Sequence, residues 1–274
     1  EALTQLKRSE QATLGCWCEV TVPEVHPNPE CRSMWDIETS VDVVFDVLPT
    51  NMRSLPNDLS PLNELAVFFD IETTSLTPET GNVIMIGSKL VYLHDSTTPT
   101  HMVVHICRQM RNDQPIWFKE KYSKDAELRW FDDEDDMIQD WCSLVRSADV
   151  WVGYNNIQFD AVYLAKRGQT PMGILEEKPR VTEKNISSKQ TGTLIYEEVY
   201  VPGVTQMDLL HVAKAELKLR TNKLNSVAEH MLGEQKVDLH WTQIVPFFKS
   251  DAPEEFWKLV SYQIEDAELP HKLL

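Results

Sequence analysis

The chain has 274 residues, which is enough for one large domain or two smaller ones with a substantial hydrophobic core. Its 42% hydrophobic and 25% charged residues are ordinary for a globular protein, and no apolar run is long enough to span a membrane. The net charge of -17 opposes broad contact with nucleic acid. Either the partner is not a nucleic acid, or contact is confined to a metal site and a few local cations, or another domain supplies the positive surface.

The first section, residues 1–64, has β character and ends in a linker. Residues 14–22 and 41–48 each predict a strand, and the proline-rich residues 49–61 predict a turn-rich linker. Asp36 and Glu38 lie here in an Asp-x-Glu pattern, but the residues before them do not form a core strand, so we interpret both acids as solvated. Five cysteines without a Cys-x-x-Cys pair indicate a reducing compartment and argue against structural zinc.

The second section opens with residues 65–74, in which five apolar residues run directly into Asp70. Such a run predicts a buried strand, in which successive side chains point to opposite faces. Asp70 and Glu72 would then share one face, while Ile71 packs on the other. Two adjacent carboxylates repel each other and are costly to desolvate, so the pattern favours an oxygen-preferring divalent cation such as Mg²⁺ or Mn²⁺. The alternative is an edge strand with two solvated acids.

The remaining elements follow in chain order. Residues 83–93 and 100–107 predict strands that continue an antiparallel meander, and residues 130–146 predict an amphipathic helix whose acidic start, residues 132–136, caps it. Another buried strand is predicted at residues 150–154. A helix follows from residue 161, and residues 176–200 predict a loop or an exposed hairpin. Three more helices are predicted at residues 207–219, 224–232 and 254–274, the second of them ended by Gly233.

Two further acids stand out beside the pair at residues 70 and 72. Asp160 follows the strand at residues 150–154, and Asp266 lies on the last helix, four residues after Tyr262. Residues four apart share a helix face, so Tyr262 and Asp266 can reach one site. Four acids from three distant segments are what a two-metal phosphodiester site requires. Asp208 is predicted to form hydrogen bonds at a helix start rather than to bind metal.

These three segments, residues 69–74 (FDIETT), 153–160 (GYNNIQFD) and 262–270 (YQIEDAELP), resemble the three exonuclease motifs of family B DNA polymerases in order and in spacing. Residues 187–192, 206–210, 217–227 and 232–236 are most similar to the delta-type, eukaryotic-like branch, which includes viral polymerases. The resemblance covers roughly residue 65 to the end. Residues 1–64 match loosely, as the tail of the N-terminal domain.

The resemblance implies an α/β, RNase H-like fold, with a mixed five-stranded sheet flanked by helices, for residues 65–274. It also implies a 3′→5′ exonuclease in which four acids hold two Mg²⁺ or Mn²⁺ ions and a tyrosine positions the water, namely Asp70, Glu72, Asp160, Asp266 and Tyr262. Asn155 and Phe159 would contact the primer 3′ end, with Thr73 and Leu76 as weaker candidates, although Phe159 can equally be a core residue. No lysine clearly matches the extra catalytic lysine of some members; Lys189 is the nearest.

The resemblance also bounds the function. The palm motif Asp-Thr-Asp has no counterpart, so we expect an exonuclease portion of a longer polymerase that acts in the nucleus, or in the host nucleus if viral. Expected partners are the single-stranded 3′ end of primer-template DNA, the rest of the polymerase, and accessory subunits or a clamp, with no membrane. The alternatives are a stand-alone tyrosine-type exoribonuclease and a catalytically silent scaffold domain.

Overall fold

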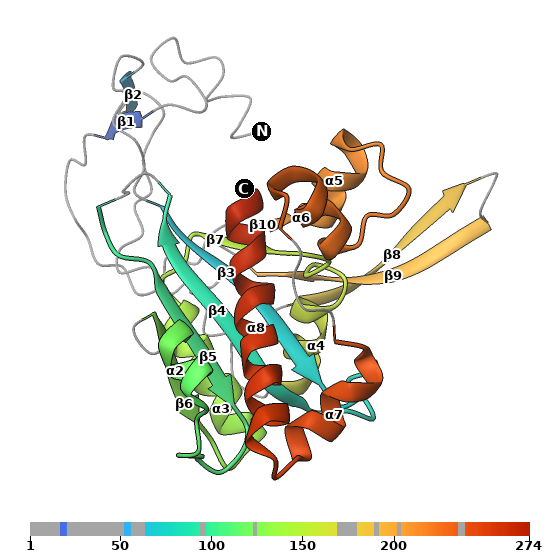
Figure 1. Ribbon diagram of the computed structural model, residues 1–274. Helices are drawn as coiled ribbons and strands as arrows, with labels where there is room; N and C mark the ends of the chain where they lie inside the picture. The colour runs from blue at the N-terminus through green and yellow to red at the C-terminus, as the bar shows by residue number, and fades with distance from the viewer. Residues whose placement is uncertain are drawn as a thin grey trace. The chain divides into compact units, whose positions relative to one another are not determined.

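The protein is described by a computed structural model covering residues 17–20, 52–55, 64–93, 97–122, 125–168, 180–188, 192–201, 204–234 and 239–274 (Figure 1). The chain divides into two compact units, Glu1–Leu62 and Asn63–Leu274. In the first unit, β1 (Trp17–Val20) pairs antiparallel with β2 (Met52–Leu55). The predicted linker at residues 49–61 is therefore wrong at residues 52–55, because a distant strand supplies their hydrogen-bond partners. The predicted strand at residues 41–48 and the acids Asp36 and Glu38 lie outside the described residues.

The second unit is built on a six-stranded sheet with the order β10-β7-β3-β4-β5-β6. Strands β3 (Leu65–Thr73), β4 (Val83–Tyr92) and β5 (His101–Ile106) run antiparallel in succession, which confirms the predicted meander. Three strands join in parallel: β6 (Ala126–Trp130) beside β5, β7 (Val150–Gly153) beside β3, and β10 (Thr205–Asp208) beside β7. The predicted α/β fold with a mixed sheet is confirmed. The sheet has six strands instead of the predicted five, with β10 and β6 at its edges.

Helices cover both faces of this sheet (Figure 1). On one face, α3 (Glu134–Val145) and α4 (Asp160–Arg167) pack in one core cluster with β3 and β7. On the other face, α2 (Ile116–Tyr122), α7 (Trp241–Lys249) and the long helix α8 (Pro253–Leu273) form a second cluster with β4 and β5. Near the C-terminal end of α8 lie α5 (Leu209–Glu216) and α6 (Leu224–Leu232), and β8 (Arg180–Ser188) forms a hairpin with β9 (Gly192–Tyr200).

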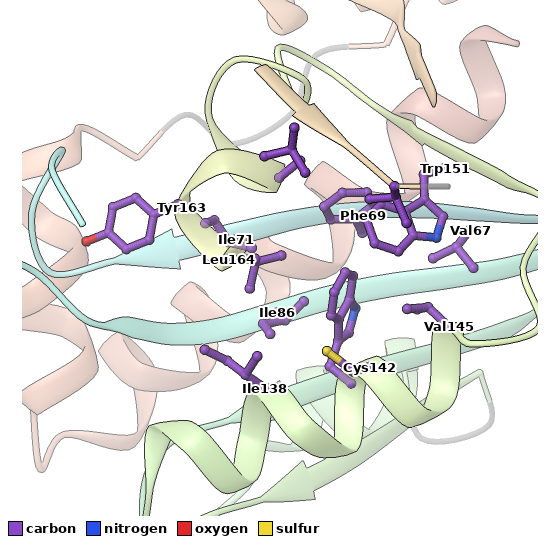
Figure 2. Close-up of a cluster of buried hydrophobic side chains, with 14 of the residues drawn as sticks. Val67, Phe69, Ile71, Ile86, Ile138, Cys142, Val145, Trp151, Tyr163 and Leu164 are labelled. Atoms are coloured by element: carbon purple, nitrogen blue, oxygen red, sulfur yellow. The ribbon is translucent and has the colours of Figure 1, made fainter. Parts of the chain in front are cut away.

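Strand β3 alternates its side chains between these two faces. Val67, Phe69 and Ile71 point into the cluster with α3 and α4, where Phe69 meets Trp151 edge to face (Figure 2). Ala66 and Phe68 belong to the cluster on the opposite face. Because the side-chain period of a strand is two, Asp70 and Glu72 share the face that α8 covers. The core therefore sets the register that aims both acids at α8.

Several expectations outside the sheet can now be compared with the structure. Asp133 caps α3 by accepting from the amides of Asp135 and Asp136, and Gly233 ends α6 with a φ of 69°, both as predicted. Of the two alternatives predicted for residues 176–200, a loop or a hairpin, the pairing of β8 with β9 favours the hairpin. The helix predicted at 207–219 begins at Leu209 instead, because the preceding residues pair with β7. The structure also contains α2, β6 and α7, which were not predicted from the sequence.

Candidate metal centre

The site begins at the end of β3, where the core gives way to carboxylates. Asp70 and Glu72 are half-buried and stand opposite Gly87 and Met85 of β4. The register of this pair shifts between Glu72 and Thr73, so the ladder is irregular directly after the second acid. Such irregularities re-aim side chains at the ends of strands. Strand β3 thus places two carboxylates on one face, next to the point where its regular pairing with β4 ends.

Helix α8 brings the third acid to the same place. The carboxylates of Asp70, Glu72 and Asp266 each offer an oxygen within 4.8 Å of the other two. Asp266 itself is buried, as part of the helix face that packs against β3 and β4. The structure therefore brings together acids from the two ends of the second unit.

Asp160 reaches β3 in a different way. It is buried at the start of α4, and its Oδ1 accepts a hydrogen bond of 3.0 Å from the backbone N–H of Ile71, the residue between the two β3 acids. Burial raises the pKa of Asp160 well above its usual range, the Ile71 amide opposes that rise, and the charges of Asp208 and Asp266 add to it. The carboxyl thus lies within the electrostatic field of Asp266, although it is not one of the three clustered acids.

Tyr262 lies one turn before Asp266 on α8. Burial raises the pKa of Tyr262, and the negative charges of Asp266, Glu72 and Asp70 raise it further, together with a hydrogen bond to Asp266. The phenol therefore stays protonated throughout the physiological range. It provides a neutral O–H group beside Asp266, within the electrostatic field of the β3 acids.

The turn between β7 and α4 contains the predicted primer contacts. Asn155 has a φ of 69°, a left-handed conformation that asparagine tolerates better than most residues, and its N–H donates to Oδ1 of Asp208 over 2.8 Å. Asp208 also accepts from the Leu210 amide at 2.9 Å and caps α5, as predicted. Phe159 is partly buried against the core and its ring lies 5.7 Å from that of Tyr163, so one part of it packs and another part remains accessible.

Thr73 is the last residue of β3, and Leu76 lies in the loop that follows it. The Thr73 hydroxyl donates to the backbone oxygen of Ser75 at 2.8 Å, which tightens the turn. The Leu76 side chain is 70% exposed. Both residues therefore lie at or near the end of β3, and their contacts in the structure do not indicate what either would bind.

The chemistry of the donor set fits divalent cations. Carboxylate oxygens are the ligands that Mg²⁺ and Mn²⁺ prefer, and three acids held within 4.8 Å repel one another without a positive charge between them. A fourth carboxyl, that of the buried Asp160, lies beside them and adds to this repulsion when it is ionised. The residues that could hold metal are therefore Asp70, Glu72 and Asp266, with Asp160 adjoining them.

Sequence reasoning overlooked one functional candidate, Gln263. This buried residue follows Tyr262, and its Nε2 donates to the carboxylate of Asp70. No local pattern distinguishes a glutamine that bonds a distant strand from one that faces solvent. Ser261, the residue before Tyr262, forms a hydrogen bond of 2.8 Å with the Tyr122 hydroxyl. Lys189 lies outside the described residues.

Comparison with known proteins identifies the family to which this geometry corresponds. Residues 8–227 match the family described as DNA polymerase family B, exonuclease domain. The DNA polymerase delta catalytic subunit of Bos taurus is 34% identical over 282 residues, covering 95% of this chain and 24% of that protein. Its counterpart in Schizosaccharomyces pombe is 30% identical, covering 79% of this chain and 20% of that protein. The chain thus spans about a quarter of the length of these relatives. Among the described residues, no helix is long and apolar enough to cross a membrane.

Proposed function

Because this chain belongs to the family B DNA polymerases, as their exonuclease domain, we propose that it hydrolyses the 3′-terminal phosphodiester of single-stranded DNA. The product would be a shortened primer, from which a mispaired nucleotide has been removed. The single observation that supports this best is the approach of Asp70, Glu72 and Asp266 within 4.8 Å. A domain that kept the fold without catalysis would have no reason to retain these mutually repelling acids.

The proposed cofactor is a pair of Mg²⁺ or Mn²⁺ ions. When bound, they activate the attacking water and stabilise the leaving oxygen. Asp70, Glu72 and Asp266 would hold them, and Asp160 would join from the start of α4. The buried hydrogen bond that the Ile71 N–H donates to Asp160 keeps that carboxyl beside β3. The protein's contribution is the fixed placement of four acids.

Tyr262 would position the attacking water. Its pKa is raised by burial and by the neighbouring carboxylates, so the phenol retains its proton and acts as a hydrogen-bonding group rather than a base. Asn155 and Phe159 would contact the primer terminus, Phe159 by stacking on a base. Thr73 and Leu76 would complete that pocket. Mismatched ends unpair at lower cost, so they would reach this single-strand site more often.

The rest of the biological setting follows from the relatives, which are named as polymerase delta catalytic subunits. We propose that the chain works within a longer polymerase, with residues 1–64 as the tail of its N-terminal domain and residues 65–274 as the nuclease. The rest of the polymerase would supply the positive surface that a chain of charge -17 lacks. Accessory subunits or a clamp would join it, in the nucleus or in a host nucleus.

The test is nucleotide release from a labelled single-stranded DNA in Mg²⁺. Asp70→Ala combined with Glu72→Ala is expected to abolish release. The matched control is Asp135→Ala combined with Asp136→Ala, which removes two exposed acids from α3 and the same charge. Wild-type rates in the first double variant would defeat the assignment. Faster release from an RNA of the same sequence would indicate an exoribonuclease instead.

A further inference from the structure

Gln263 connects α8 to the first acid of β3. Its Nε2 donates to the backbone oxygen of Asp70 at 2.8 Å and to the Asp70 carboxylate oxygen Oδ2 at 3.1 Å. The side-chain amide group thus contacts both the main chain and the side chain of a single residue. Because the two donors are on one planar NH₂ group, the Asp70 carboxylate is fixed in position relative to its own backbone.

The chemistry of the partners determines the orientation of this amide. If the side chain were turned over, its Oε1 would face two acceptor oxygens of Asp70, and all three would repel one another. In the orientation observed, Oε1 is buried and has no hydrogen-bond partner among the described residues. A buried acceptor without a partner costs free energy. The two bonds to Asp70 are therefore retained at the expense of an unsatisfied oxygen.

The sheet leaves space for this arrangement at Gly87, the residue paired with Asp70 in β4. A Cβ atom at Gly87 would lie 2.9 Å from Nε2 and 2.9 Å from the backbone oxygen of Gln263. Only glycine allows α8 to approach this closely at that point. Tyr262 and Asp266 lie within three residues of Gln263 on α8, so one helix provides an acid, a hydroxyl and the amide that holds the opposing acid.

We propose that Gln263 is a positioning residue of the metal centre, which holds Asp70 at the spacing from Asp266 that divalent cations require. This inference rests on the proposed function. The amide's N–H groups also offset part of the repulsion between the two carboxylates before any cation binds. Groups that orient metal ligands in this way commonly affect metal affinity by about 10- to 100-fold.

The experiment measures Mn²⁺ binding to the full 274-residue chain by calorimetry, with no substrate present. Gln263→Met retains the length of the side chain and removes the donor, and it is expected to weaken Mn²⁺ binding by about 10-fold or more. The matched control is Gln206→Met on β10. Gln206 also donates to a backbone oxygen, that of Val199 at 2.8 Å, and has a buried Oε1 without a partner among the described residues, but it bonds no acid of the cluster.

Thermal unfolding in EDTA separates positioning from general damage. Both variants lose one amide and are expected to lose similar stability, whereas only Gln263→Met should bind Mn²⁺ more weakly. If Gln263→Met does not fold, Gln263→Asn replaces it, since a shorter amide remains polar but withdraws from Asp70. Wild-type Mn²⁺ affinity in the folded variant would overturn the inference. A wild-type chain that binds no Mn²⁺ at all would instead overturn the proposed metal centre.

Discussion

The Asp160 carboxyl lies against the backbone of Ile71, whose N–H donates to Oδ1 over 3.0 Å. Ile71 is the residue that separates Asp70 from Glu72, so the hydrogen bond connects the start of α4 to the part of β3 that carries both acids. The side chain of Ile71 meanwhile packs on the opposite face, in the core with α3 and α4. One residue thus connects the hydrophobic core, the strand and the fourth acid.

Asp160→Asn is expected to separate stability from activity. The amide oxygen of asparagine can still accept from Ile71, while the buried charge near Asp208 and Asp266 is removed. Because burial disfavours the ionised carboxyl, the variant should unfold at the same or a higher temperature than the wild type in EDTA at pH 8. With added Mn²⁺, scanning calorimetry should show the wild type unfolding at a higher temperature than the variant. The nuclease activity of the variant should fall at least about 100-fold. A variant that matches the wild type in activity would remove Asp160 from the site.

Gly153→Ala is expected to displace the turn that carries Asn155 and Asp160. A Cβ atom at residue 153 would lie 2.6 Å from Cβ of Asn156 and 3.0 Å from the backbone oxygen of Phe69. Neither neighbour is the end of a flexible side chain, so the turn must shift. We expect the unfolding free energy to fall by about 1–3 kcal/mol, as for other overpacked cores. Urea titration measures this, with Gly233→Ala as a control in which the introduced Cβ has no contact within 4 Å.

The control also indicates how the two glycines differ. Gly233 has a φ of 69°, so alanine there should cost about 1 kcal/mol through backbone strain alone. Gly233→Ala should leave nuclease activity unchanged, because Gly233 lies after α6 and a Cβ atom there contacts nothing within 4 Å. Equal losses of activity in the two variants would contradict the interpretation of the Gly153 turn.

Much of the site was predictable from the sequence because its acids follow strong local patterns. Asp70 and Glu72 end an unbroken apolar strand, and Tyr262 and Asp266 share a helix face, so each pair could be placed from periodicity alone. The relation between Asp160 and Ile71 could not be predicted in this way. It depends on how α4 lies against β3, which no local spacing encodes. The same holds for Gln263, whose amide resembles any polar helix residue until the opposing strand is known.

The fold shows the same division between local and distant determinants. The meander of β3, β4 and β5 was predictable because each strand is apolar and ends in turn residues. The short strands β2 and β10 were missed, since their partners β1 and β7 lie far away in sequence. Met207 and Asp208 fit a helical stripe as well as a strand. Pairing with β7 decides between the two, and the helix starts only after Asp208 has capped it.

His105 is expected to make stability depend on pH. Burial lowers the pKa of its imidazole to about 4, Asp140 opposes that shift, and Arg129 adds to it. The folded state therefore holds a neutral ring, whereas the unfolded chain takes up a proton near pH 6.5. Stability from this group is complete above pH 6.5 and is lost as the pH falls towards 4. The loss should approach about 1.4 kcal/mol per pH unit within that window.

Urea titrations at pH 7, 6, 5 and 4 measure this dependence. His105→Gln should reduce the slope between pH 6.5 and 4, because glutamine keeps a donor for Asp140 without taking up a proton. The control is His101→Gln, at the exposed start of β5, where the ring pairs with Glu127 on the surface. An unchanged slope in His105→Gln would show that other groups, such as the acids of the metal centre, dominate the acid sensitivity.

Tyr262→Phe tests whether the hydroxyl positions water or binds metal. The ring remains packed, and only the O–H group beside Asp266 is lost. A positioning role predicts a fall in kcat of about 10- to 100-fold with Mn²⁺ affinity nearly unchanged, because the carboxylates that hold the ions are still present. Tyr122→Phe is the matched control, since that hydroxyl belongs to a buried tyrosine and also reaches α8, at Ser261 and Glu265. Single-turnover rates at saturating Mn²⁺ provide the comparison. If Tyr262→Phe loses Mn²⁺ binding in proportion to its rate, the hydroxyl belongs to the ligand set, and the water must be positioned by another group.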